Sequence, residues 1–353
     1  MIRVGLVGCG FIGMVHSYAL KALRDAGLIH AQVVAVCDRD PDRASSFARA
    51  HGAEVTPDVD TTVAACDALW VCTPTAEHLD VVEAAARAGR AVFCEKPLGR
   101  DLAEARRVAG ALASVPHQVG LVLRHAPVFR ALADHLDGRH GRVMGLTLRD
   151  DQYFPIGGMY ASDWRADRAQ AGSGVLLEHS IHDLDLFDFL LGPSLGPPTA
   201  VSCRTAEFAG HDGVEDAAAA HVVFGPADEP VVAALTTVWH QVPTRPSTRR
   251  IEVFCEQAFL WANDDLVGPL HVETAEGEQT DPGPTPDWVA SLPVPDDFRK
   301  PLAQYAGPAK SFLDALAAGR EPAGPGAEDA LAAHRLCHAA YESAAQGGAP
   351  VTP

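Results

Sequence analysis

Over the first 122 residues, short apolar runs alternate with longer segments whose hydrophobic residues recur at helical spacing. The apolar runs at 2–7, 32–37, 69–72, 91–94 and 118–123 predict buried strands. The segments at 11–26, 41–51, 76–88 and 101–113 predict helices, and Asp40-Pro41 supplies a cap and a first-turn proline for the second of them. Apolar strands that alternate with amphipathic helices indicate a parallel sheet with helices on both faces.

The pattern changes after a helix predicted at 128–136. Strand-like segments then follow one another at 143–149, 200–205, 217–224, 231–239, 251–255 and 259–261. Strands without intervening helices predict a largely antiparallel sheet. One long helix is expected at 173–191, ended by Gly192-Pro193, and helices at 302–318 and 327–345 close the chain. Residues 276–301, rich in proline and acidic side chains, are expected to form a long surface loop.

Composition narrows the class of protein. The length of 353 residues corresponds to about two domains. The net charge of −18 disfavours the basic face that sequence-independent binding of nucleic acid requires. No apolar run reaches the ~18 residues of a membrane helix, and the strand predicted at 2–7 leaves no room for a signal peptide before it. The eight cysteines include no C-x-x-C pair, so we expect reduced core residues in a cytoplasmic protein.

A glycine-rich turn follows the first predicted strand directly and opens the first helix. It reads Gly8-Cys9-Gly10-Phe11-Ile12-Gly13, the G-x-G-x-x-G pattern of dinucleotide-binding turns. Gly8 permits the tight turn, Gly10 lets the backbone approach a pyrophosphate, and Gly13 lets helix and strand pack closely. We therefore expect an α/β chain with an N-terminal Rossmann fold in residues 1–123. Residues 124–353 are expected to form an α+β domain with a large, mainly antiparallel, open-faced sheet.

The end of the second strand bears on the choice of dinucleotide. Asp38 stands where a carboxylate can accept hydrogen bonds from both hydroxyls of the adenosine ribose, and it would repel a 2′-phosphate. This favours NAD over NADP. The guanidinium of the neighbouring Arg39 is able to pair with a 2′-phosphate, so NADP stays open as an alternative.

Lys96 is the first residue with evident reaction chemistry. The segment Glu95-Lys96-Pro97 follows the fifth strand, where open α/β sheets place their ligands. An ammonium group beside a bound nicotinamide can donate to a substrate hydroxyl and stabilise a developing alkoxide. Pro97 removes a backbone donor and is compatible with a cis peptide bond.

A second cluster of ionisable residues lies in the helix predicted at 173–191. On a continuous helix Glu178, His182 and Asp185 would lie along one face, at positions i, i+4 and i+7. A histidine near a carboxylate has a pKa close to neutrality, which suits proton transfer to and from an alcohol. Histidine and acidic residues also bind metals, but no second matched cluster accompanies them, so we expect no metal site. A capped helix with satisfied polar groups is the structural alternative.

Several segments together resemble the Gfo/Idh/MocA family of sugar and cyclitol oxidoreductases. Besides the glycine turn, residues 72–78 (CTPTAEH) resemble the family's T-P-x-x-x-H turn. Residues 89–97 (GRAVFCEKP) resemble its E-K-P segment, the most specific signature. Residues 120–124 resemble the strand that enters the second domain. Trp164-Arg165 and residues 172–185 resemble its W-R…G-G-G-x-L-x-D-x-G-x-H-x-x-D pattern.

This resemblance implies roles for individual residues. Lys96 and His182 would be the catalytic pair, with Glu178 at the position usually held by aspartate. Ser173 and Ser180 replace glycines of the pattern, and His179 adds an imidazole beside the site. The second domain would commonly be buried in a dimer interface. Residues expected to contact the cofactor are, besides the glycine turn, Asp38 and Arg39, also Thr73, Pro74, His78, Glu95, Lys96, Trp164 and Arg165.

The resulting expectation is an oxidoreductase that moves a hydride between NAD and a secondary carbinol carbon of a sugar, cyclitol or aminosugar. The substrate is expected to contact Lys96, Arg124, Glu178, His179, His182, Trp239 and His240. The chain is expected to form a homodimer or homotetramer. Two alternatives stay open: glycoside cleavage through transient oxidation and elimination with the same cofactor, and a regulator that senses the dinucleotide without catalysis.

Overall fold

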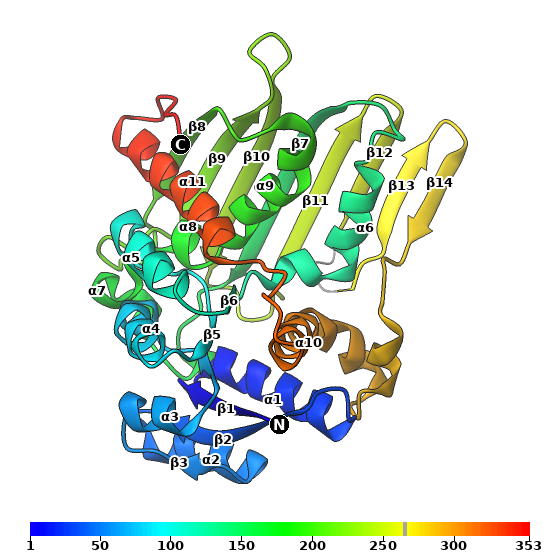
Figure 1. The fold of residues 1–353 in the computed structure, drawn as a ribbon. Coiled ribbons are helices and arrows are strands. Elements are labelled where there is room, and N and C mark those ends of the chain that lie inside the picture. The colour runs from blue at the N-terminus through cyan, green and yellow to red at the C-terminus, as the bar shows by residue number, and fades with distance from the viewer. Residues whose placement is uncertain (264–266) are drawn as a thin grey trace.

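The N-terminal part of the chain forms a six-stranded parallel sheet (Figure 1). The computed structural model describes residues 1–263 and 267–353. The strand order is β3-β2-β1-β4-β5-β6, so the order in which strands are added reverses between β1 and β4, where such sheets bind ligands. The strands are β1 (Ile2–Val7), β2 (Ala31–Cys37), β3 (Glu54–Val55), β4 (Ala68–Val71), β5 (Ala91–Cys94) and β6 (His117–Val119). The helices are α1 (Phe11–Asp25), α2 (Pro41–His51), α3 (Val59–Ala65), α4 (His78–Arg87) and α5 (Leu102–Leu112).

The second sheet has eight strands in the order β14-β13-β12-β11-β7-β10-β9-β8. Neighbouring strands are antiparallel except β7 and β10, which run parallel. The fold class expected from the sequence is therefore confirmed. The strands are β7 (Val143–Tyr153), β8 (Ala200–Ala206), β9 (Ala217–Phe224), β10 (Val231–His240), β11 (Thr248–Cys255), β12 (Ala258–Ala262), β13 (Leu270–Thr274) and β14 (Gly277–Asp281).

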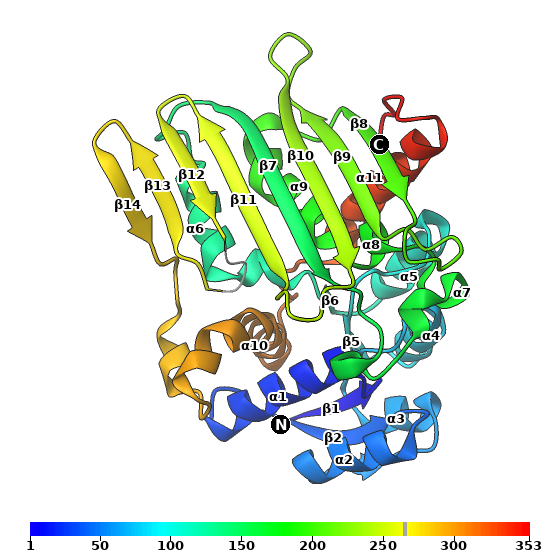
Figure 2. The same cartoon turned by 180° about the vertical axis from the view of Figure 1, so that it is seen from behind.

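One face of this sheet is covered by helices and the other is not. Helices α6 (Pro127–His135), α9 (Ile181–Leu195) and α11 (Ala327–Ala345) lie on the covered face, and Figure 2 shows the opposite face without helices. Side chains alternate between the two faces along each strand. The strand register places Val232, Gly145, Phe254 and Phe259 in one row on the open face. Val232 and Phe254 are exposed, so this face carries an apolar stripe.

The two C-terminal helices return to the first domain. Helix α10 (Asp296–Ala317) packs against α1, and α11 packs against α5 (Figure 1). Phe312 of α10 meets the stacked rings of Trp70 and Phe93 edge-on, at centroid distances of 5.5 and 6.0 Å. The Rossmann sheet is thus covered on one face by a helix that comes almost 200 residues later in the chain. The expected boundary at residue 123 stays a prediction.

Two expectations about individual elements are wrong, and one strand was not anticipated. Residues 276–301 are not one surface loop, because they contain β14, a short 3-10 helix at Asp287–Ser291 and the first turns of α10. Strand β13 was not anticipated. The helix expected at 173–191 is interrupted after α8 (Val175–Glu178), and α9 continues past Gly192-Pro193 to Leu195. The expectation for the cysteines is confirmed, since all eight are free and buried. Among the described residues, no helix is both long and apolar enough to cross a membrane.

Candidate active site

The glycine turn between β1 and α1 has the shape that a dinucleotide requires. Gly8 has φ +94°, and a Cβ on it would approach the carbonyl of Cys72 to 2.5 Å. A Cβ on Gly13 would lie 2.2 Å from the carbonyl oxygen of Gly8. Gly10 caps α1 without a side-chain hydrogen bond, and the space a Cβ would take there is open. The first amide groups of α1 therefore face an open space that suits a pyrophosphate.

Asp38 lies beside this turn. Its carboxylate accepts hydrogen bonds from the backbone amides of Cys9, at 2.6 Å, and of Asp40, at 2.8 Å. Arg39 forms an ion pair with Glu77 at 2.9 Å. Arg43 donates to the carbonyl of Ala161 in the second domain. Asp38 is thus fixed beside the glycine turn, while the guanidinium groups of Arg39 and Arg43 have partners of their own. Its contact with the ribose stays a prediction.

Lys96 links the two domains. It follows β5, and its Nζ donates to the backbone carbonyl of Glu178 at 2.8 Å. Burial lowers the pKa of Lys96, which the charges of Glu178 and Glu95 partly oppose. Glu95 is itself buried and bonded to His16 at 2.7 Å. The Lys96–Pro97 peptide is cis, in line with the sequence-based expectation.

Both ring nitrogens of His78 lie near backbone carbonyl groups of the protein. Its Nδ1 lies 2.9 Å from the carbonyl of Pro97 and its Nε2 lies 3.1 Å from the carbonyl of Thr73. Burial lowers the pKa of His78 and favours the uncharged imidazole, although the two carbonyls oppose this. An uncharged imidazole has one N–H, so it donates to only one of the two carbonyls, and its other nitrogen lies near the second. The ring thus lies between the turn after β4 and the segment after Lys96. A direct contact of His78 with the cofactor stays a prediction.

The segment that carries Glu178 is held in place by the carboxylate of Glu215. The buried carboxylate of Glu215 accepts hydrogen bonds from the amides of Gly174, at 2.8 Å, and Leu176, at 3.0 Å, and from the hydroxyl of Tyr341, at 2.7 Å. A Cβ on Gly174 would lie 1.8 Å from the carbonyl oxygen of Glu215. This steric limit explains why a glycine stands at the start of α8, whereas Ser173 next to it is accommodated.

Glu178 points toward the first domain. Its Oε1 accepts a hydrogen bond from Thr75 at 2.7 Å, and its Oε2 lies 3.4 Å from Nε of Arg165. Arg165 in turn stacks over the ring of Trp164 at 4.2 Å. Burial raises the pKa of Glu178, although Arg165 and Lys96 favour the charged form. The carboxylate thus holds Thr75 and the Trp164-Arg165 segment together at the domain interface.

The single helix face expected for Glu178, His182 and Asp185 does not exist, because the helix breaks at His179 and Ser180. Asp185 binds Arg124 through both carboxylate oxygens. His182 is buried, and burial together with the charges of Lys96, Arg249 and His179 holds its pKa well below the ordinary value. The imidazole is therefore uncharged at neutral pH and able to accept a proton.

The remaining residues expected at the substrate are distributed differently. Arg124 bridges Asp185 and Asp329 and is largely covered. Trp239 is buried against Phe154. His240 follows Trp239 on β10, so it points to the opposite face of the sheet, where its Nε2 lies 3.7 Å from Asp151. A contact of Arg124, Trp239 or His240 with substrate stays a prediction.

The sequence reasoning missed three residues that face the helix break from the second sheet. These are Asp150 on β7, Thr237 on β10 and Arg249 on β11, all buried. Asp150 lies opposite Thr237 in one strand pair and opposite Arg249 in the other. Each stands at a position where the alternation of its strand calls for an apolar side chain, which is the signal that could have identified it.

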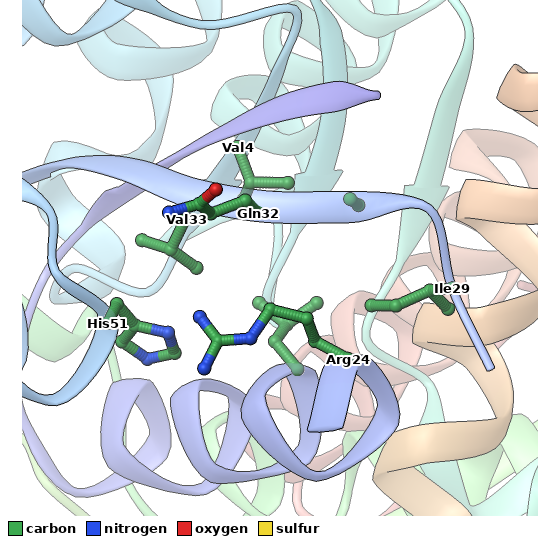
Figure 3. A pocket seen from close by; sticks show the side chains of 8 residues that line it. Val4, Arg24, Ile29, Gln32, Val33 and His51 are labelled. Carbon is green, nitrogen blue, oxygen red and sulfur yellow. The ribbon is translucent and has the colours of Figure 1, made fainter. Parts of the chain in front are cut away.

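A small cavity between α1 and β2 is distinct from this site (Figure 3). It is lined by Arg24, Gln32 and His51 among others and holds about 10 Å³, room for about one water. It lies at the amino end of β2, whereas the glycine turn and Lys96 follow the carboxyl ends of β1 and β5. Ligands of open α/β sheets bind at the carboxyl ends.

Comparison with known proteins agrees with this geometry. Residues 2–121 match the family model for oxidoreductases of the GFO/IDH/MocA type with an NAD-binding Rossmann fold, and residues 129–260 match the model for the GFO/IDH/MocA C-terminal domain. The chain belongs to the Gfo/Idh/MocA family. It is accordingly an NAD-dependent oxidoreductase.

Individual relatives extend over nearly the whole chain. The inositol 2-dehydrogenase of Rhizobium meliloti (strain 1021) is 32% identical, over 98% of this chain and 97% of its own. The structure of an oxidoreductase domain protein from Kribbella flavida is 26% identical, with a TM-score of 0.84 over 100% of this chain and 99% of its own. GenD2 of gentamicin A biosynthesis, solved in complex with NAD, is 25% identical, with a TM-score of 0.80 over 100% and 96%.

Asp38 is predicted to make this Gfo/Idh/MocA protein prefer NAD over NADP. Asp38→Ser is expected to raise the affinity for NADP relative to NAD, because it removes a carboxylate that a 2′-phosphate would face. Titration calorimetry with both dinucleotides measures the ratio. Asp60→Ser, an exposed carboxylate in the first turn of α3, serves as the control and is expected to leave the ratio unchanged. Tighter binding of NADP than of NAD by the wild type would contradict the role given to Asp38.

Proposed function

We propose that the protein transfers a hydride between NAD and a secondary hydroxyl or ketone of a sugar, cyclitol or aminosugar, with a cyclitol as the first substrate to test. The observation that carries the proposal is that Lys96, at the carboxyl end of β5, donates to the carbonyl of Glu178, four residues before His182, and that its charge acts on His182. Lys96 comes from the cofactor domain and is partly buried, whereas His182 comes from the second domain and is buried. The full-length similarity to an inositol 2-dehydrogenase supports a cyclitol.

In the direction of oxidation, the bound NAD supplies the hydride acceptor. His182 accepts the proton of the substrate hydroxyl, which its uncharged imidazole permits at neutral pH. Lys96 donates a hydrogen bond to the same oxygen and stabilises the negative charge that develops there. The carbonyl of Glu178 fixes the ammonium group in place.

The substrate class is tested by adding myo-inositol, levoglucosan, scyllo-inositol and D-glucosamine to the protein with NAD and following absorbance of the reduced cofactor. We expect reduction of NAD with at least one cyclitol, and the ketone product is identified by mass spectrometry. Release of an aglycone from a glycoside without accumulation of NADH would instead indicate cleavage. Binding of NAD without turnover of any polyol or aryl glycoside would contradict the proposed function.

Lys96→Ala and His182→Ala are each expected to leave the affinity for NAD nearly unchanged and to reduce kcat by about 10²–10⁴-fold. Both side chains act on the oxygen whose charge changes most between the ground state and the transition state. The double variant is expected to be far less impaired than the product of the two single losses, because both residues serve one proton transfer.

The pH profile of kcat/KM tests the same assignment. His182 must be uncharged, so activity is expected at neutral pH and lost as pH falls through its pKa, which lies below 6.5. Lys96 must be charged, so activity falls again as pH rises through its pKa, which lies below 10.5. A His182→Ala variant with the wild-type rate and the same acidic limb would exclude His182 as the base, and His179 would be tested next.

We also propose that the open face of the second sheet pairs with a second copy of the chain. The apolar row of Val232, Phe254 and Phe259 supports this, since an exposed stripe of this kind usually marks an interface. A two-fold axis would set the same patch against itself. The homotetramer expected as the alternative would require a further interface.

Light scattering at micromolar concentration is expected to report a dimer or tetramer for the wild type. Phe254→Asp is expected to shift the protein toward the monomer, because a carboxylate would be buried in the interface. Phe208→Asp, at another exposed phenylalanine outside the strands, is the control and is expected to leave the mass unchanged. A monomeric wild type would contradict the pairing.

A further inference from the structure

Three polar side chains form a row across the middle of the second sheet, on its covered face. Thr237, Asp150 and Arg249 are direct neighbours on β10, β7 and β11. We call them the polar row. All three are buried, and the nearest inward-facing positions on the same strands, such as Leu148 and Ile251, are apolar. Burying polar groups in an apolar face costs stability unless each group forms a hydrogen bond or an ion pair. The groups that the polar row binds therefore indicate its role.

Each member of the polar row holds a different residue at the break between α8 and α9. Thr237 is bonded to the hydroxyl of Ser180 at 2.7 Å. Asp150 lies 2.7 Å from Nε2 of His179. Nε of Arg249 donates to Asp183 at 2.8 Å, and its other end binds Asp150. The backbone at 179–183 is thereby held at three points.

His182 lies inside this segment, between two residues that the polar row binds. Its amide bonds to the carbonyl of His179 at 3.3 Å, so the backbone at the break sets the direction of its side chain. Lys96 approaches the same segment from the other side through the carbonyl of Glu178. The polar row and Lys96 thus both hold the segment that carries the proposed base.

The charges of this cluster also bear on His182. Arg249 brings one positive charge, and Asp150 and Asp183 bring two carboxylates. Burial and the neighbouring Asp150 raise the pKa of Asp183 to about 7, although Arg249 opposes this. The groups whose charges act on His182 are Lys96, Arg249 and His179.

We propose that Arg249 is a positioning residue of the reaction: by joining Asp150 to Asp183 it fixes the break between α8 and α9 so that His182 faces the substrate. The inference rests on the proposed function, in which His182 is the base.

The first test follows the imidazole of His182 by NMR in the NAD-bound protein, with the signal assigned by its loss in His182→Gln. Arg249→Met is expected to raise the titration midpoint of His182 by about one unit, the order of effect of one nearby charge. Arg142→Met is the matched control, because Arg142 also binds two carboxylates, Glu229 and Glu256, but is exposed at the far end of the same sheet. An unchanged midpoint in Arg249→Met would overturn the proposal even if no substrate has been found.

The second test separates position from charge. Arg249→Lys keeps the charge, but one ammonium does not reproduce the bidentate geometry that joins two carboxylates. It is expected to keep the midpoint of His182 near the wild-type value and yet to lower kcat, toward the ~10²-fold loss that misplacement of a reacting group by about 1 Å causes. Wild-type kcat in Arg249→Lys would exclude a positioning role. If Arg249→Met fails to fold, kcat of Arg249→Lys still tests the positioning role.

The third test asks whether Arg249 merely compensates buried charge. Arg249→Met/Asp183→Asn removes one carboxylate along with the cation and is expected to recover part of the thermal stability lost in Arg249→Met, without recovering kcat. Full recovery of kcat would show that neutrality alone matters.

Discussion

The hydrogen bond from Nζ of Lys96 to the carbonyl of Glu178 is the contact through which the two domains share one site. Lys96 is fixed at the end of a Rossmann strand, and Glu178 ends a one-turn helix of the second domain. If this bond were absent, the ammonium group would be free to turn toward water, and the proposed catalytic pair would not be brought together. Glu178 contributes twice, since its carboxylate also binds Thr75 of the first domain.

The break between α8 and α9 is the second determinant of the site. A continuous helix would place Glu178 and His182 on one face as direct neighbours, and the carboxylate would then act on the imidazole. Because of the break, Glu178 binds Thr75 at the domain interface instead. Asp150 binds His179, and Arg249 binds Asp150. The substitution of glutamate for the family's usual aspartate fits this arrangement, because the longer side chain reaches Thr75.

Much of the fold could be predicted because it depends on local patterns. The alternation of apolar strands and amphipathic helices predicted the Rossmann domain, and the glycine turn located its ligand-binding end. Lys96 and His182 were found from motifs. Asp150, Thr237 and Arg249 were not, because they lie on three separate strands and become neighbours through sheet register, which depends on long-range pairing. Strand β14 was missed because its residues are mostly polar and exposed, as suits an edge strand.

Helix α10 completes the core of the first domain, although it is synthesised late. The apolar face of the Rossmann sheet around Trp70 and Phe93 is completed by Phe312, so it lacks its cover while the first two-thirds of the chain emerge from the ribosome. Contacts so distant in sequence close slowly. The nascent N-terminal domain therefore lacks part of its aromatic core until α10 has been synthesised.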